Sequence, residues 1–279
     1  MKAVVNVNGV LMPAEGPCLP LNNRAYHFGD GLFESIRVVD GKACFLDAHW
    51  ARLSTGAEIL HIGLPQGMDR KGFGQRMDEL VEACGVRSAR CRFTLYRAGG
   101  GQYMPESNDG LYTIELWPMD ERSYTLNMQG LVVDIWPAMR KPINDLARLK
   151  TLNGEFYIMA ALWSKERHLD DCLLQNERGN IIESSCGNLF IVSNGVLYTP
   201  SLADGCMGGV MRAQVINIAL GNGIKVYECA LNPQNLLAAD ELFFTNAVRG
   251  IQWVSAYRTK RYSHRLSTLL TERLVEQVV

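Results

Sequence analysis

Residues 146–188 constrain the fold and chemistry of this chain more than any other stretch. Within it, apolar side chains recur at three- and four-residue spacing, which predicts an amphipathic helix with Lys150 at its entry. These apolar residues are Leu152, Phe156, Met159, Ala160 and Trp163. Glu183 follows as an acid within an otherwise apolar strand, and the small residues after it turn the chain into a further strand. The stretch therefore places an amine and an acid on two largely apolar elements.

A lysine and a carboxylate in such surroundings are typical of one kind of cofactor site. A lysine amine becomes a nucleophile when partial burial favours loss of its proton, and its covalent partner is usually a carbonyl or an aldehyde cofactor. A carboxylate against a pyridine nitrogen keeps that nitrogen protonated, so that the ring withdraws electrons from the group on its aldehyde carbon. Lys150 and Glu183 fit a pyridoxal phosphate site, whereas an arbitrary pair of this kind is more often a surface lysine and a helix-capping acid.

The flanking sequence decides between these interpretations, because several blocks match one family in order along nearly the whole chain. The blocks are Arg24–Arg37, Leu46–Leu53, Lys150–Asn153, Glu183–Phe190, Tyr198–Gly205 with Gly208–Arg212, and Thr245–Val248. In these blocks the chain resembles the class IV aminotransferases, which are the fold-type IV pyridoxal phosphate enzymes. That group includes branched-chain aminotransferases, D-amino acid aminotransferases and aminodeoxychorismate lyases.

The resemblance implies a two-domain α+β / α/β architecture with pyridoxal 5'-phosphate in the cleft between the domains. A chain of 279 residues is long enough for two cores. We expect a small N-terminal α/β domain at residues 1–118, an interdomain linker at 119–124, and a larger C-terminal cofactor-binding domain with a β-barrel-like core at 125–279. Members of the family are usually homodimers, and we expect a homodimer here.

By resemblance, separate parts of the chain bind the cofactor phosphate. Arg52 offers a forked guanidinium, although on its predicted helix the alternative is a solvated side chain. Gly208–Gly209 precede a predicted helix over 210–220, whose first amides make a natural anion site, and the alternative there is a simple turn. The family commonly has threonine where this chain has Met211. The expected cofactor-binding set is Arg52, Lys150, Glu183, Gly209, Val210, Met211, Asn246 and Ala247.

The resemblance also places five residues in the substrate pocket. They are Phe28, Phe33, Ser35, Arg37 and Arg97. Arg97 stands at the base of a glycine-rich loop, which lacks a dinucleotide-binding fingerprint and which we interpret as a mobile loop over the cleft. Two interpretations stay open for this arginine: it holds a substrate carboxylate, or it pairs with an acid across the sheet.

Two features favour 4-amino-4-deoxychorismate lyase, which forms 4-aminobenzoate and pyruvate on the route to folate. Branched-chain enzymes usually have glycine at the position of Ser35 and a Thr-Gly-Thr-Ala-like segment at Thr245–Val248, and this chain differs at both. In a lyase, Arg37 and Arg97 would hold the carboxylates of a dianionic ring substrate. The alternative is an aminotransferase of branched-chain or D-amino acids with 2-oxoglutarate as acceptor. In either reaction Lys150 forms the Schiff base and carries the proton.

Two further observations bear on whether the site is intact. A second alternative is an inactive family member that serves as a binding protein. The joint presence of Lys150, Glu183 and Arg52 speaks against it, because mutations that accumulate in an inactive protein would not selectively preserve these three residues. Glu155 stands near the place where branched-chain enzymes have a tyrosine that contacts the cofactor hydroxyl, and the sequence offers no account of a carboxylate there.

Charge and composition exclude several other partners. The formal net charge is −1 and there is no long basic run, so we expect a small-molecule amino substrate and no nucleic acid or membrane surface. No stretch of about eighteen apolar residues and no leader-like N-terminus is present, which predicts a cytoplasmic protein. The eight cysteines include no Cys-x-x-Cys pair, which argues against a metal site and against a disulfide framework.

Overall fold

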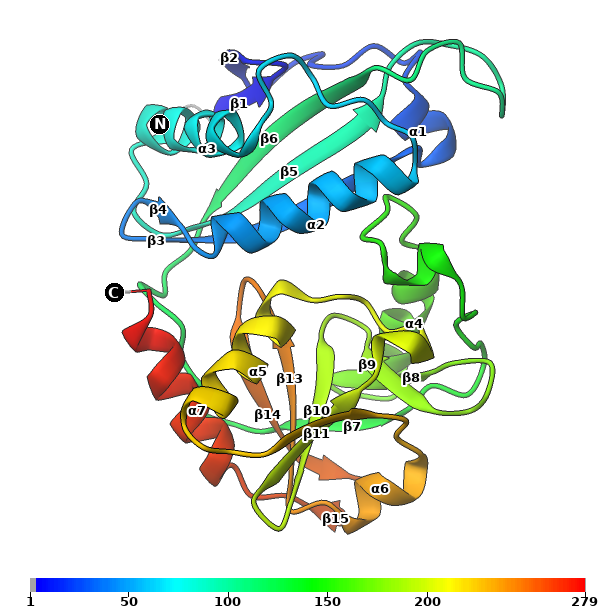
Figure 1. Ribbon diagram of the computed structural model, residues 1–279, viewed down its shortest axis with the longest axis vertical. Coiled ribbons are helices and arrows are strands. Elements are labelled where there is room, and N and C mark those ends of the chain that lie inside the picture. Colours follow the sequence, from blue (N-terminus) through cyan, green and yellow to red (C-terminus); the bar gives the residue numbers. More distant parts are fainter. Residues whose placement is uncertain (1–3, 279) are drawn as a thin grey trace. The chain divides into compact units, whose positions relative to one another are not determined.

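The structure, a computed structural model, describes residues 4–278. These residues form two compact units (Figure 1). The first unit comprises residues 4–123 and 150–153, and the second comprises residues 124–149 and 154–278. No helix within residues 4–278 is long and apolar enough to span a membrane.

The first unit is built on a six-stranded antiparallel sheet with the order β2-β1-β6-β5-β3-β4. The strands are β1 (Val4–Val7), β2 (Val10–Pro13), β3 (Gly31–Val39), β4 (Lys42–Ala43), β5 (Ala89–Arg97) and β6 (Gly110–Pro118). Asn8 and Gly9 form the turn between β1 and β2 with φ values of 51° and 91°. A two-residue hairpin requires this backbone conformation, which the Asn-Gly pair adopts readily.

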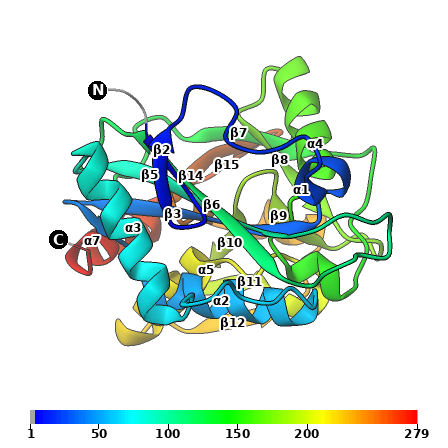
Figure 2. The ribbon, with the colours of Figure 1, turned by 90° about the horizontal axis from the view of Figure 1, so that it is seen from above.

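Helices α2 (Leu46–Ile59) and α3 (Arg70–Cys84) cover one face of this sheet, and α1 (Arg24–Phe28) precedes β3 (Figure 1, Figure 2). Phe73 of α3 packs on Phe93 of β5 with ring centroids 4.9 Å apart. Glu34, directly opposite Phe93 in the β3–β5 pairing, contacts α2 on the same face. Because strand side chains alternate, Phe33, Ser35 and Arg37 lie on the opposite face of the sheet.

The second unit contains a closed ring of six strands. The ring consists of β7 (Leu131–Ile135), β8 (Asp171–Gln175), β9 (Ile181–Ser184), β10 (Asn188–Ser193), β13 (Glu241–Asn246) and β14 (Gly250–Tyr257). Each strand pairs with the next, and β9 closes the ring on β10 through Glu183 and Asn188. Strands β11 (Val196–Pro200), β12 (Val226–Cys229) and β15 (Lys260–Arg261) extend it. The predicted barrel-like core is therefore confirmed.

Helices surround this barrel. They are α4 (Glu155–Glu166), α5 (Val210–Gly221), α6 (Pro233–Ala238) and α7 (Arg265–Glu276), with short 3-10 turns η1 (Asp145–Arg148) and η2 (Leu202–Asp204). Phe190 and Phe243 stack at 5.1 Å between centroids in the buried core. Burial of these apolar strand residues is the main contribution to stability of such a unit.

The segment around Lys150 corrects two expectations. Lys150 does not enter the helix directly, because α4 begins only at Glu155. Instead, the amide of Phe33 donates to the carbonyl of Lys150 at 2.9 Å, and the amide of Leu152 donates to Gly31 at 3.0 Å. Strand β4 pairs only with the far end of β3, so the near end offers unpaired backbone groups that this segment satisfies. Residues 150–153 consequently cluster with the first unit, whereas the sequence placed them in the C-terminal domain.

Candidate active site

Lys150 lies against an aromatic ring in the first unit. Its Nζ is 4.2 Å from the centroid of the Phe33 ring. Arg92 of β5 reaches the same ring, with its Cζ 3.9 Å from the centroid. Ser35 is directly opposite Arg92 in the β3–β5 pairing, so its hydroxyl borders this group. The structure thus brings together three predicted residues, Lys150, Phe33 and Ser35, and adds Arg92.

Arg92 is a residue that sequence reasoning missed, although its alternation with apolar neighbours marked one face of the strand. Burial lowers the pKa of Arg92, Glu115 raises it and Arg90 lowers it. A guanidinium keeps its charge through such shifts. Its Nε donates to Oγ1 of Thr94 at 3.2 Å, and its terminal nitrogens have no acceptor among residues 4–278. A charged fork of this kind can receive a carboxylate.

Arg52 is held by a buried acid of β3. Its Nε donates to Oε1 of Glu34 at 2.8 Å, and Nη2 donates to Oε2. Nδ1 of His49 lies 2.6 Å from the same Oε2. Burial alone would raise the pKa of Glu34, but the charge of Arg52 and the hydrogen bonds of both neighbours lower it to about 2. The Arg52 side chain is 16% exposed, so the solvated alternative is wrong, and its role toward a phosphate stays a prediction.

This pairing predicts a specific acid sensitivity. Because the pKa of Glu34 is about 2 in the fold against an ordinary value of 4.5, the carboxylate stabilises the fold at neutral pH by on the order of 3 kcal/mol. This contribution to the free energy of unfolding is fully present at pH values above the ordinary pKa of 4.5. It is lost as the pH falls through the pKa in the fold, about 2. We expect Glu34→Gln to remove this part of the pH dependence of unfolding, measured with urea across the acid range. An unchanged acid profile would contradict the pairing.

Both terminal nitrogens of Arg37 contact groups within the first unit. Its side chain is 1% exposed. Nη2 donates to Oγ of Ser88 at 3.1 Å and to the carbonyl of Glu121, and Nη1 contacts Sδ of Met119. These partners come from the segments that flank β5 and β6, so Arg37 ties the end of β3 to them. The substrate role expected for Arg37 therefore needs correction: it is a buried structural residue.

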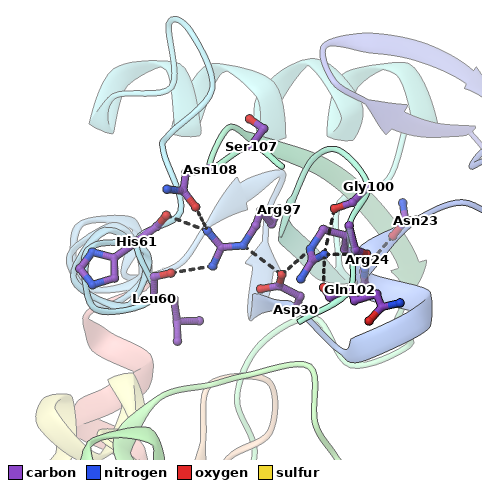
Figure 3. Close-up of polar contacts among 12 residues, drawn as sticks. Asn23, Arg24, Asp30, Leu60, His61, Arg97, Gly100, Gln102, Ser107 and Asn108 are labelled. Carbon is purple, nitrogen blue, oxygen red and sulfur yellow. Dashed lines mark hydrogen bonds and ion pairs between the residues drawn. The ribbon is translucent and has the colours of Figure 1, made fainter. Parts of the chain in front are cut away.

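Arg97 pairs with an acid, which is the second of its two interpretations (Figure 3). Its Nε donates to Oδ2 of Asp30 at 2.9 Å, and Nη1 donates to Oδ1 of Asn108. Nη1 and Nη2 also donate to the carbonyls of His61 at 2.9 Å and Leu60 at 2.7 Å. Those two carbonyls follow the end of α2, where helical partners are missing and a cation is favourable. Arg97 is thus an internal anchor of the first unit.

Asp30 has a second guanidinium partner, Arg24, which also hydrogen-bonds the glycine-rich loop. Nε of Arg24 donates to Oδ2 of Asp30 at 2.8 Å, and Nη1 donates to the carbonyl of Gln102 at 2.8 Å (Figure 3). Phe28 packs on this arginine, with Cζ 4.9 Å from its ring centroid, and on Tyr103 of the loop at 5.8 Å. The structure therefore places Phe28 with the loop, and its predicted contact with substrate stays a prediction.

Glu183 is buried in β9 of the second unit with hydrogen bonds on both oxygens. Oε1 accepts from Nζ of Lys141 at 2.6 Å and from the hydroxyl of Tyr157 at 3.0 Å, and Oε2 accepts from the amide of Met207 at 2.8 Å. Burial raises the pKa of Tyr157, and Glu183 raises it further, so the phenol stays protonated and donates. Sequence reasoning missed Lys141 and Tyr157 because neither contact follows from a periodic pattern: Lys141 is 42 residues and Tyr157 is 26 residues from Glu183 along the chain.

The unexplained carboxylate of Glu155 has a simple place in the structure. Glu155 is the first residue of α4 and is exposed. Tyr157 follows two residues later, and its hydroxyl reaches Glu183. Residues two apart lie on nearly opposite sides of a helix, so the acid faces away when the phenol faces the barrel. A tyrosine is therefore present two positions further along the chain, and the contact that the structure gives it is with Glu183.

The start of α5 offers open backbone donors. Gly209 is its N-cap residue, and no side chain in the described part of the chain caps the helix. A Cβ at Gly209 would lie 1.8 Å from Oδ1 of Asn188, so the close approach requires glycine. The side-chain nitrogen of Asn188 donates to the carbonyl of Met207 at 2.7 Å, which holds the preceding turn. The first amides of a helix lack intrahelical acceptors, so Val210 and Met211 begin an element suited to an anion.

A buried hydroxyl adds to this anion site. Thr245 of β13 is directly opposite Asn188, whose side chain touches the first turn of α5. Thr245 is 1% exposed, and its Oγ1 has no hydrogen-bond partner among residues 4–278. A buried hydroxyl without a partner is unfavourable unless a ligand or water completes it. The glycine turn, the amides and this hydroxyl together fit a phosphate group, for which Thr245 would supply the hydroxyl that Met211 lacks.

Replacing Thr245 tests the fit. We expect Thr245→Val to lower the affinity for pyridoxal 5'-phosphate by roughly tenfold or more, because a hydrogen bond to a charged group is lost. The cofactor-free protein should unfold at the same or a slightly higher temperature, since the variant removes a buried hydroxyl that has no partner among residues 4–278. Equilibrium dialysis and thermal unfolding measure the two effects.

The matched control is Thr199→Val in β11, which β10 separates from β13 in the sheet. The Thr199 hydroxyl is buried and donates to the carbonyl of Leu189 at 2.8 Å. Its loss should destabilise the protein by about 1 kcal/mol and leave cofactor affinity unchanged. Equal affinities for wild type and Thr245→Val would remove Thr245 from the phosphate site.

Asn246 and Ala247 shape the turn between β13 and β14. Oδ1 of Asn246 accepts from the amides of Val248 at 3.1 Å and Arg249 at 2.8 Å. The carbonyl of Ala247 accepts from the hydroxyl of Tyr124 at 2.8 Å. The asparagine side chain is therefore engaged within its own turn. Contacts of these two residues with phosphate or substrate stay predictions.

Comparison with known proteins finds one matching family model and relatives with names from that family. Residues 31–257 match the family model described as Amino-transferase class IV. The branched-chain-amino-acid aminotransferase of Pseudomonas aeruginosa is 29% identical over 232 residues, which cover 78% of this chain and 73% of the relative. The aminodeoxychorismate lyase of Vibrio harveyi is 24% identical over 238 residues, which cover 85% and 86%.

The fold has a close counterpart among solved structures. The crystal structure of a branched-chain aminotransferase from Thermoproteus uzoniensis with norvaline matches with a TM-score of 0.89 at 24% identity. The match covers 98% of this chain and 93% of that chain. It confirms the predicted fold class. Because the family model also extends from β3 to the end of β14, this chain belongs to the amino-transferase class IV family, whose members are pyridoxal 5'-phosphate enzymes.

Proposed function

We propose that this chain is an aminotransferase that takes branched-chain amino acids as donors and 2-oxoglutarate as acceptor. The observation that carries the proposal is the arrangement of arginines in the first unit. A lyase would need Arg37 and Arg97 for its dianionic substrate, but both are bonded internally. Arg92 instead lies on the Phe33 ring together with Lys150. One guanidinium beside an apolar ring suits an aliphatic amino acid and one side-chain carboxylate of the acceptor.

The proposal gives each group a distinct role. When bound, the cofactor withdraws electrons from the substrate carbon that carries the amino group, which makes its proton removable. Lys150 would hold the cofactor covalently and carry that proton. Glu183 would accept a hydrogen bond from the ring nitrogen. Thr245, the first amides of α5 and Arg52 would hold the phosphate.

Amino-group transfer can be measured directly. Purified protein with pyridoxal 5'-phosphate should convert L-leucine, L-isoleucine and L-valine to their keto acids only when 2-oxoglutarate is present. A panel of D-amino acids under the same conditions tests the opposite chirality. Keto acid formation from D-alanine but not from the L-branched-chain donors would reject the donor class proposed here.

The lyase remains a second candidate because two observations favour it. Ser35 places a hydroxyl beside Arg92, where branched-chain enzymes usually have glycine, and a lyase is among the relatives reported above. The test is incubation with 4-amino-4-deoxychorismate without an amino acceptor. Release of 4-aminobenzoate and pyruvate would replace the aminotransferase proposal by the lyase.

Arg92 supplies a prediction that separates binding from chemistry. We expect Arg92→Leu to raise the KM for 2-oxoglutarate by roughly tenfold or more, because a charge-assisted hydrogen bond to its carboxylate is lost. The KM for L-leucine, measured with a saturating acceptor, should change less. Arg90→Leu is the control, since Arg90 is exposed and lies over Trp117 at 5.3 Å. Equal effects of the two variants would contradict a substrate role for Arg92.

The assembly expected from the resemblance and the location expected from the sequence also stay proposals. We propose a cytoplasmic homodimer, and sedimentation equilibrium of the purified protein tests the dimer. An inactive binding protein is disfavoured because Lys150, Glu183 and Thr245 are all present in a setting that fits the cofactor. Absence of any turnover in a protein that binds the cofactor covalently would restore that alternative.

A further inference from the structure

Lys141 is a buried cation with no part in the roles described so far. Its side chain is 8% exposed, and Nζ lies 2.6 Å from Oε1 of Glu183. The backbone around it is fixed on both sides: its amide donates to Gln175 at 2.9 Å, and its carbonyl accepts from Glu177 at 3.1 Å. Burying an ammonium group is costly unless an acid compensates it. The position of Lys141 is therefore determined by β8 and its charge is balanced by Glu183.

The neighbours of Glu183 supply hydrogen bonds but no second cation. Burial raises the pKa of Tyr157, and burial together with Glu183 raises the pKa of Cys206 to about 12. Both groups are consequently neutral near pH 7. Met207 contributes only its backbone amide. Within residues 4–278, Glu183 forms its ion pair with Lys141.

The hydrogen bonds of Glu183 leave room for one more donor. An ionised carboxylate has about four lone-pair positions. Lys141 and Tyr157 donate to Oε1, whereas Oε2 accepts from Met207. The remaining acceptor position is therefore on Oε2. A ring N–H that bonds there would share the carboxylate charge with the ammonium group on Oε1.

We propose that Lys141 is a positioning residue that serves as the counter-ion of Glu183 and competes with the cofactor ring nitrogen for its negative charge. This inference rests on the proposed role of Glu183. Lys141 keeps the carboxylate compensated and oriented before the cofactor binds. With the cofactor bound, two cations face one acid, so Lys141 weakens the hold of Glu183 on the protonated ring nitrogen.

The test compares two cofactors that differ at the ring nitrogen. Wild type, Lys141→Met and Lys141→Arg are titrated with pyridoxal 5'-phosphate and with its carbocyclic analogue, in which carbon replaces the ring nitrogen. Quenching of protein fluorescence gives both dissociation constants. We expect the preference for the true cofactor to increase about tenfold in Lys141→Met, because the ring nitrogen becomes the only cation at Glu183. Lys141→Arg keeps the charge and should keep the wild-type preference.

A stability measurement covers the case in which Lys141→Met folds poorly. Its cofactor-free form should unfold at a lower temperature than wild type, because Glu183 becomes an uncompensated buried charge. Adding Glu183→Gln to Lys141→Met should recover most of the loss, since both charges are then absent. Tyr157→Phe is the matched control: it removes a hydrogen bond from the same oxygen without changing the charge, and the cofactor preference should stay constant.

The remaining outcomes would overturn either the role of Lys141 or the role of Glu183. An unchanged or smaller cofactor preference in Lys141→Met, with a clear preference in wild type, overturns the role of Lys141 alone. A double variant that is no more stable than Lys141→Met does the same. Equal affinity of wild type for both cofactors would overturn the role of Glu183 and the present inference together.

Discussion

Lys150→Ala is expected to lower turnover by roughly 10⁴-fold, because the variant loses both the covalent attachment point and the group that moves the proton. Borohydride reduction of the wild-type holoenzyme should fix the cofactor to Lys150, and mass spectrometry of the peptides identifies the modified residue. Reduction of Lys150→Ala should leave the cofactor removable by dialysis. The Phe33 ring centroid lies 4.2 Å from Nζ of Lys150, so the ring borders the amine to which the cofactor would attach.

Lys165→Ala is the control for this experiment. Lys165 lies exposed in the last turn of α4, so its loss should leave turnover and attachment unchanged. Attachment of the cofactor to Lys141 in place of Lys150 would reject both the assignment of Lys150 and the counter-ion role of Lys141.

Asp30→Asn is expected to destabilise the protein by about 3 to 5 kcal/mol, the largest stability effect predicted here. The carboxylate of Asp30 accepts from the guanidinium groups of Arg24 and Arg97, both of which are nearly buried (Figure 3). An amide in its place leaves two buried cations without a compensating charge. Urea unfolding monitored by tryptophan fluorescence measures the loss.

Glu79→Gln provides a matched change of carboxylate to amide at an exposed pair. Glu79 bonds Arg76 on α3, and both side chains are more than a third exposed. Such surface pairs contribute about 0 to 1 kcal/mol, so this variant should remain close to wild type. Similar losses in Asp30→Asn and Glu79→Gln would mean that the Asp30 cluster is not a main contribution to the stability of the first unit.

The fold could be predicted, and candidate site residues could be named, because their signals are local. Helical spacing, strand alternation and glycine turns depend on residues close in sequence, and the ordered blocks identified the family. Lys150 and Glu183 were recognisable for the same reason, since each stands out against apolar neighbours. The start of α5 was recognisable from Gly208–Gly209 alone.

The roles of three strand arginines could not be predicted from such local signals. Arg37, Arg92 and Arg97 alternate with apolar residues in strands in the same way, and the sequence does not distinguish them. Their roles differ because their acceptors come from remote segments: Glu121 for Arg37, and Asp30 for Arg97. A guanidinium is available to a ligand only where the fold brings no such acceptor, as at Arg92.

The sequence by itself determined the family, the two cores, the amine and the acid, because these follow from side-chain chemistry and short-range periodicity. The tertiary structure alone decided which charges are already compensated. It paired Arg52 with Glu34 and Lys141 with Glu183, and within residues 4–278 it left the Thr245 hydroxyl without a hydrogen-bond partner. The physical reason is that the free energy of a buried charge depends on groups within a few ångströms, and in a barrel or an antiparallel sheet those groups are far apart along the chain.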